Sequence, residues 1–152
     1  MADDSDVLLE LWRGHREEAR QMENQRAALT NIVIIVVAAG FGFLAQQGDL
    51  RASSLCVTVP MFILGAFGVL VCTKYGERWA RHAKQAEAFA RALERQHQSL
   101  DLATLLTVSH TEHRARFPRI KRVKIWALWV VLHAGISAGG LLLSVWALAA
   151  GP

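Results

Sequence analysis

The chain has 152 residues, of which 53% are hydrophobic, and its formal net charge is +4. A soluble domain of this length would be less apolar and would spread its charges along the chain, whereas here the charges are segregated. The composition therefore argues against an ordinary soluble domain. The excess of positive charge fits attraction to anionic lipid better than a nucleic-acid partner.

Three stretches carry no Asp, Glu, Lys or Arg, namely residues 27–45, 53–72 and 125–150. A helix needs about 20 apolar residues to cross a hydrocarbon core of about 30 Å, and soluble helices rarely carry so long an uncharged run. The sequence therefore predicts an all-α integral membrane protein with three transmembrane helices. The first two spans are expected to form a hairpin, because the link between them is too short for anything but a tight turn.

Residues 1–26 are predicted to form a cytoplasmic amphipathic helix. The start of the chain is acidic and lacks the basic region and cleavage site of a signal peptide, so we expect it to begin in the cytoplasm. A stripe of side chains recurs every three or four residues, as on one face of a helix. It consists of Leu8, Leu11, Trp12, His15, Ala19 and Met22. We expect this stripe to pack against another helix or another subunit.

The transmembrane hairpin, residues 27–72, contains residues that indicate helix packing. Asn31 lies near the cytoplasmic end of the first span and is expected to join helices through hydrogen bonds. Gly65 and Gly68 in the second span should let helix backbones approach closely.

Residues 73–124 are predicted to be a cytoplasmic helical segment that ends in a basic collar. A second stripe, rich in alanine, has the same helical spacing as the first. It consists of Trp79, Ala83, Ala86, Phe89, Ala90 and Leu93. Ser99 or Asp101 is expected to cap a short helix that ends at Pro118. We expect the first two spans to continue into the cytoplasm as the long helices that bear the two stripes.

The basic collar, residues 114–124, holds six cationic side chains in eleven positions. Such a patch can bind nucleic acid, but here an uncharged stretch follows it directly. Lys and Arg beside a span attract an anionic membrane surface by about 1 kcal/mol each. We therefore expect the collar to contact lipid headgroups and to bind no specific nucleic acid. The residues expected to do so are Arg119, Lys121, Arg122 and Lys124.

The third span, residues 125–150, combines small residues with one strongly polar side chain. Gly135 and Gly139 stand four residues apart, which is the spacing that lets two helices approach closely. His133 lies deep in the span, and ionisable groups at such a depth are functional candidates. We favour the interpretation that it is neutral and bonds a hydroxyl or a backbone carbonyl across a helix interface.

The distribution of basic residues predicts the orientation. Of the 17 Lys and Arg residues, four lie in residues 1–26, one lies in the link between the first two spans, and twelve lie in residues 73–124. Basic segments tend to stay on the cytoplasmic side. We therefore expect a multi-pass protein of the cell membrane, the inner membrane in a bacterium, with its N-terminus in the cytoplasm.

No motif points to catalysis or to a cofactor. The sequence has no nucleophile elbow, P-loop or glycine-rich phosphate loop, so we expect no enzyme, no catalytic residue and no cofactor. His110 and His113 stand one helical turn apart but lack a third ligand at motif spacing, so no metal site is expected. No carboxylate lies in any span, which argues against a transporter coupled to protons or ions.

The segments WRGHREEARQMENQR and KYGERWARHAKQAEAF flank the two paired spans. From about residue 7 to residue 95, the order of charged helix, transmembrane hairpin and long charged helix resembles two families. These are the SLATT-type membrane effectors of nucleotide-signalling conflict systems and the RipA-type octameric membrane proteins of bacteria. The resemblance implies a homo-oligomer and, for the effectors, a role in permeabilising a membrane. The third span and its basic collar are additions to that arrangement.

The sequence thus predicts a non-enzymatic, homo-oligomeric membrane module that contacts membrane lipid. It would act as a pore-forming effector or as an assembly whose cytoplasmic helices dock a protein partner. One alternative is an accessory or scaffold subunit that conducts nothing, and another is a small transporter.

Overall fold

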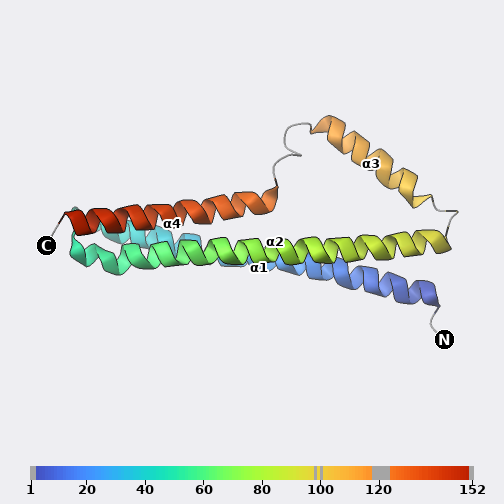
Figure 1. The fold of residues 1–152 in the computed structure, drawn as a ribbon, viewed down its shortest axis with the longest axis horizontal. Coiled ribbons are helices and arrows are strands. Elements are labelled where there is room, and N and C mark those ends of the chain that lie inside the picture. The colour runs from blue at the N-terminus through green and yellow to red at the C-terminus, as the bar shows by residue number, and fades with distance from the viewer. Residues whose placement is uncertain (1–2, 98, 100, 118–123, 151–152) are drawn as a thin grey trace. The chain divides into compact units, whose positions relative to one another are not determined.

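The computed structural model describes residues 3–97, 99, 101–117 and 124–150, with the backbone alone at 102, 103, 105 and 106. Within this part of the chain every regular element is a helix (Figure 1). Three of the helices are long and apolar enough to cross a membrane. The predicted helical fold class and its three candidate spans are confirmed to this extent.

Two of the helices are much longer than a membrane requires. α1 extends over Asp4–Gln47 and α2 over Leu55–Gln96, each as one continuous helix. α3 follows at Leu102–Arg116 and α4 at Ile125–Ala149. α1 and α2 each join an uncharged stretch to a charged one within the same helix.

A short link connects α1 to α2. Gly48, directly after α1, has a φ of +78°, a left-handed conformation that ends helices and favours glycine. The 3-10 helix η1 (Ala52–Ser54) then leads into α2. The buried Ser54 hydroxyl accepts a hydrogen bond from the Arg51 backbone over 3.2 Å and donates one to Gln47 over 3.1 Å. These bonds tie the end of α1 to η1.

The chain folds into two compact units. The first, here called the polar unit, comprises Met1–Glu23 and Gly76–Lys124. The second, here called the apolar unit, comprises Asn24–Tyr75 and Ile125–Pro152 and contains the three uncharged stretches. α1 and α2 therefore contribute to both units, α3 belongs to the polar unit, and α4 belongs to the apolar unit.

In the apolar unit three helices pack around a small interior. Val33 and Val37 of α1 form a buried cluster with Met61 of α2, and Ile136 of α4 packs against it. Many other large apolar side chains face outward; Ile35, for example, is 67% exposed. An apolar outer surface of this kind suits lipid and would be unfavourable in water.

In the polar unit the first part of α1 lies antiparallel to the last part of α2 (Figure 1). Ser5 Oγ donates a hydrogen bond to Gln96 Oε1 over 3.1 Å, and His15 meets His82 further along the two helices. Ala86 is buried in the contact. Small side chains at such positions allow the two helices to lie close together, as the alanine-rich stripe indicates.

Candidate functional site

His133 of α4 is fully buried in the apolar unit. Its Nε2 lies 3.2 Å from Thr30 Oγ1 of α1, in a hydrogen bond whose donor depends on the tautomer of the ring. The ring also lies against Gly68 of α2, where a methyl group would overlap it. Among the described residues its Nδ1 has no hydrogen-bond partner. Because a proton relay needs a partner at each ring nitrogen, the geometry favours a structural role for this histidine.

Two further sets of hydrogen bonds join α4 to α2. Ser137 Oγ donates to the backbone carbonyl of Phe62 over 3.1 Å. Ser144 Oγ lies 2.8 Å from both Thr58 Oγ1 and the Gly140 carbonyl. Since a hydroxyl has one proton, Thr58 donates to Ser144 whenever Ser144 donates to the carbonyl. We call this set of interhelical contacts the polar seam; its side chains are Thr30, Thr58, His133, Ser137 and Ser144.

Glycines allow the helices to approach closely along the polar seam. A methyl group at Gly65 would overlap the backbone of Ser137, and one at Gly140 would overlap the backbone of Phe62. A methyl group at Gly135 or Gly139, in contrast, would have no atom of a neighbouring helix within 4 Å. Gly65 thus faces α4 within the same chain, whereas the pair in the third span faces away from its neighbours.

Sequence reasoning did not single out the close approach at Gly140 or the hydroxyl groups of Thr30, Thr58 and Ser144. The signal was present, because His133, Gly140 and Ser144 follow one another at intervals of seven and four residues on one face of α4. Those intervals place Gly140 and Ser144 on the same side of α4 as His133, which was identified from the sequence. The GISAG spacing, residues 135–139, instead predicts packing through the opposite side of α4.

The polar seam holds helices together, and its only ionisable side chain is His133. No carboxylate belongs to it, so it contains no pair of groups for acid and base catalysis. In the described part of the chain, no group of three or more His, Cys, Asp or Glu side chains could hold a metal ion. What the seam evidently provides is a defined packing of α4 on α1 and α2.

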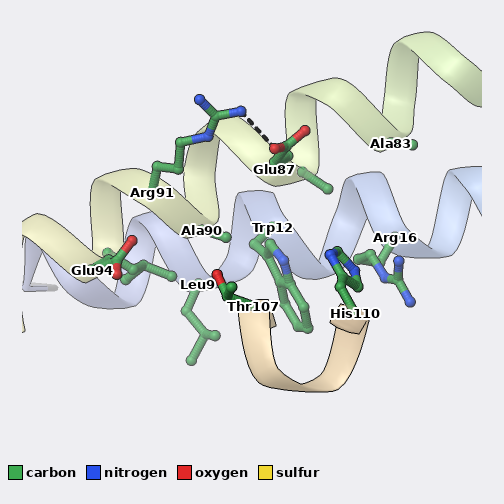
Figure 2. A pocket seen from close by; sticks show the side chains of 12 residues that line it. Leu9, Trp12, Arg16, Ala83, Glu87, Ala90, Arg91, Glu94, Thr107 and His110 are labelled. Carbon is green, nitrogen blue, oxygen red and sulfur yellow. Dashed lines mark hydrogen bonds and ion pairs between the residues drawn. The ribbon is translucent and has the colours of Figure 1, made fainter. Parts of the chain in front are cut away.

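A groove of about 810 Å³ opens in the polar unit (Figure 2). Trp12 of α1 and Ala90 of α2 contribute to its apolar lining, and His110 of α3 lies at its edge. On the rim, Arg91 forms an ion pair with Glu87 over 2.6 Å. An apolar lining with charged groups around it is typical of a binding surface.

His15 and His82 face each other across the polar unit. Their Nδ1 atoms are 3.1 Å apart, so one Nδ1 donates a hydrogen bond that the other accepts, in a direction set by the ring tautomers. The His15 ring also stacks on Phe89, with 5.4 Å between the ring centroids. His82 fits the spacing of its stripe, between Trp79 and Ala86, so the sequence contains a signal for this contact.

The other candidate residues lie at the surface or outside the described residues. Asn31 is exposed, and the buried hydrogen bond at this level is made by its neighbour Thr30. Trp12 is half-buried in the groove, whereas Trp79 is exposed. Lys124 is exposed directly before α4. The remaining predicted headgroup residues lie outside the described residues; they are Arg119, Lys121 and Arg122.

The chain thus has two candidate functional regions, each contained within one unit. The polar seam joins the helices of the apolar unit, and the groove is a candidate binding surface on the polar unit. Compared with protein-family models, with curated proteins and with solved structures, the chain has no match.

Proposed function

We propose that this chain is a non-enzymatic, homo-oligomeric membrane module whose three spans carry a layer of cytoplasmic helices. The division of polar and apolar groups in the apolar unit supports this proposal best. Thr30, Thr58, His133 and Ser144 are buried and hydrogen-bonded, while many large apolar side chains face outward. Helices with satisfied backbones and an apolar outer surface are stable in lipid.

The distribution of charge supports a cytoplasmic position for the polar unit. The basic residues gather before the first span and between the second and third spans. Such an excess of Lys and Arg keeps a segment on the cytoplasmic side during insertion. α1 and α2 would then carry the contacts between His15 and His82 into the cytoplasm as extensions of a transmembrane hairpin.

The outward face of α4 offers a place for a second copy of the chain. Gly135 and Gly139 lie there with nothing within 4 Å, so neither packs against the chain's own helices. Val131 and Leu142 lie on the same face and are 68% and 69% exposed. Two small residues between larger ones form a shallow notch, and this spacing favours close pairing of helices in membranes.

Gly135→Leu and Gly139→Leu are each expected to weaken self-association about tenfold, because a bulky side chain fills the notch and separates the paired helices. The mass of the complex in mild detergent, measured by native mass spectrometry or light scattering, checks this. Ala134→Leu is a matched control, because it adds a bulky side chain at an exposed α4 position outside the notch. A monomeric wild-type chain would contradict the proposal, and so would an equal loss in the control.

Of the activities expected from the sequence, docking a protein partner has better support than conduction. A pore needs polar side chains or carbonyls that face a shared path for water or ions. Four of the seam side chains instead are buried within a single chain, where Thr30 bonds His133 and Thr58 bonds Ser144. The groove beside Trp12 supplies a surface on the polar unit. We therefore favour an accessory or scaffold assembly over a pore-forming effector.

Lipid vesicles that contain the wild-type protein are expected to retain an entrapped fluorescent dye, because the seam opens no polar path through one chain. Dye release, measured against protein-free vesicles, checks this expectation. Release that rises with protein content and falls in Gly135→Leu would instead favour a pore built between subunits. Vesicles with the Ala134→Leu control should behave like those with the wild type.

A further inference from the structure

Arg26 is a buried arginine without a counter-charge in the described structure. It is 6% exposed, and no described carboxylate forms an ion pair with it. The uncharged stretch 27–45 begins directly after it. A guanidinium group keeps its charge under all ordinary conditions, and burying that charge without an anion is unfavourable.

Arg26 lies against Trp129 of α4. Its guanidinium carbon is 5.9 Å from the centroid of the indole ring, which is within the range of a cation–π interaction. The ring face attracts the cation, but it supplies no negative charge and no hydrogen-bond acceptor. The contact therefore positions the arginine without compensating its charge.

Two hydrogen-bond donors in this contact have no acceptor. Arg26 Nε and Trp129 Nε1 are buried, and neither has a hydrogen-bond partner among the described residues. Both groups are N–H donors that cannot accept. A water molecule could accept a hydrogen bond from one of these donors but would not compensate the charge of the guanidinium group. An anion with several oxygens could accept hydrogen bonds and also compensate that charge. An oxyanion therefore fits the missing partner better than water does.

The position of these residues along their helices indicates which oxyanion would complete the site. Arg26 immediately precedes the first span, and Trp129 lies in the first turns of α4. Both would lie near the cytoplasmic headgroups in the proposed orientation, and arginine and tryptophan extend their polar ends toward that layer. Phosphate is the abundant anion at this depth, and guanidinium binds phosphate through paired hydrogen bonds.

We infer that Arg26 and Trp129 form a binding site for the phosphate of an anionic phospholipid at the cytoplasmic end of the apolar unit. The inference rests on the membrane placement proposed above. It differs from the headgroup contacts expected of the basic collar, because Arg26 belongs to α1 and is buried in the apolar unit. The lipid would contribute to the packing of α4 on α1 by supplying the missing charge.

The test uses the full chain reconstituted with phosphatidylglycerol and phosphatidylethanolamine, and native mass spectrometry counts the lipids that each variant retains. Arg26→Gln should reduce retained phosphatidylglycerol about tenfold, because it removes the charge and the paired donors. Arg20→Gln is the matched control, since Arg20 is on the same helix but exposed and ion-paired with Glu17. It should retain as much phosphatidylglycerol as the wild type.

Two conservative variants keep the test decisive if Arg26→Gln fails to fold. Trp129→Phe keeps an aromatic face for the cation but loses the indole N–H together with part of the ring, so it should retain about threefold less phosphatidylglycerol. Arg26→Lys keeps the charge but loses the paired donors and should lose a similar amount. Resistance to alkaline extraction from the vesicles shows that each variant is inserted.

Unchanged phosphatidylglycerol retention in inserted Arg26→Lys and Trp129→Phe would overturn the inference, as would an equal loss in Arg20→Gln. Excess inorganic phosphate is added in a separate arm. Displacement of lipid from the wild type by this phosphate would assign the site to a free anion and overturn the lipid assignment. If the wild type fails to insert in any lipid mixture, the proposed function fails instead.

Discussion

Replacing Gly140 with Ala should destabilise the apolar unit by about 2 kcal/mol, whereas the same change at Gly139 should not destabilise it. A methyl group at Gly140 would overlap the backbone of Phe62 and Met61, and backbone atoms cannot turn aside as a flexible side chain can. At Gly139 nothing lies within 4 Å. Alanine there should gain up to about 1 kcal/mol from its higher helix propensity.

The free energy of unfolding of the purified protein, measured by titration with SDS in mixed micelles, checks this result. Gly65→Ala should resemble Gly140→Ala, because its methyl group would overlap the backbone of Ser137. Alanine at Gly139 remains small enough for close helix pairing, so any effect on self-association should be slight. Equal destabilisation at Gly139 and Gly140 would show that α4 does not present this face to α2.

The helices and candidate spans could be predicted because charge is strictly segregated along this chain. Residues 27–45 and 125–150 contain no charged side chain, and the intervening charged segments keep a helical spacing of apolar residues. A continuous α1 then requires only that no residue break the helix, and residues 1–47 contain no proline. These are local properties that a single sequence displays.

Which face of α4 packs inside the chain depends on rotation about the helix axis, which is a tertiary property. Gly135 and Gly139 have the spacing of a packing motif, yet the close approach to α2 occurs at Gly140. The choice depends on where hydroxyl partners such as Thr58 lie on the neighbouring helix. The motif spacing alone carries no information about those partners.

Arg26 and Thr30 were not identified from the sequence for a related reason. Arg26 counted among the basic residues that set the orientation, and a residue at a span boundary is usually exposed to headgroups. Its burial against Trp129 depends on α4, which lies about a hundred residues further along the chain. Asn31 drew attention as the stronger polar group, but one position along the helix changes the direction of a side chain by about 100°.

Gly68→Ala should destabilise the wild-type protein by about 1–3 kcal/mol but should be tolerated in a chain that already carries His133→Ala. The methyl group would overlap the Cγ, Nδ1 and Cε1 atoms of the His133 ring. His133→Ala alone should destabilise by about 2–4 kcal/mol, because it leaves a cavity and removes the hydrogen bond between Thr30 and the ring. In the double variant the added methyl group occupies part of that cavity.

The four free energies of unfolding, for the wild type, both single variants and the double variant, form a double-mutant cycle. Its coupling free energy should be about 2 kcal/mol in the direction of rescue, because the two side chains compete for one space. Gly65→Ala with Ser137→Ala is the matched control. The atoms that a methyl group at Gly65 would overlap are the backbone and Cβ of Ser137, which alanine keeps, so no rescue is expected. Additive effects of Gly68→Ala and His133→Ala would show that the imidazole ring does not lie on Gly68.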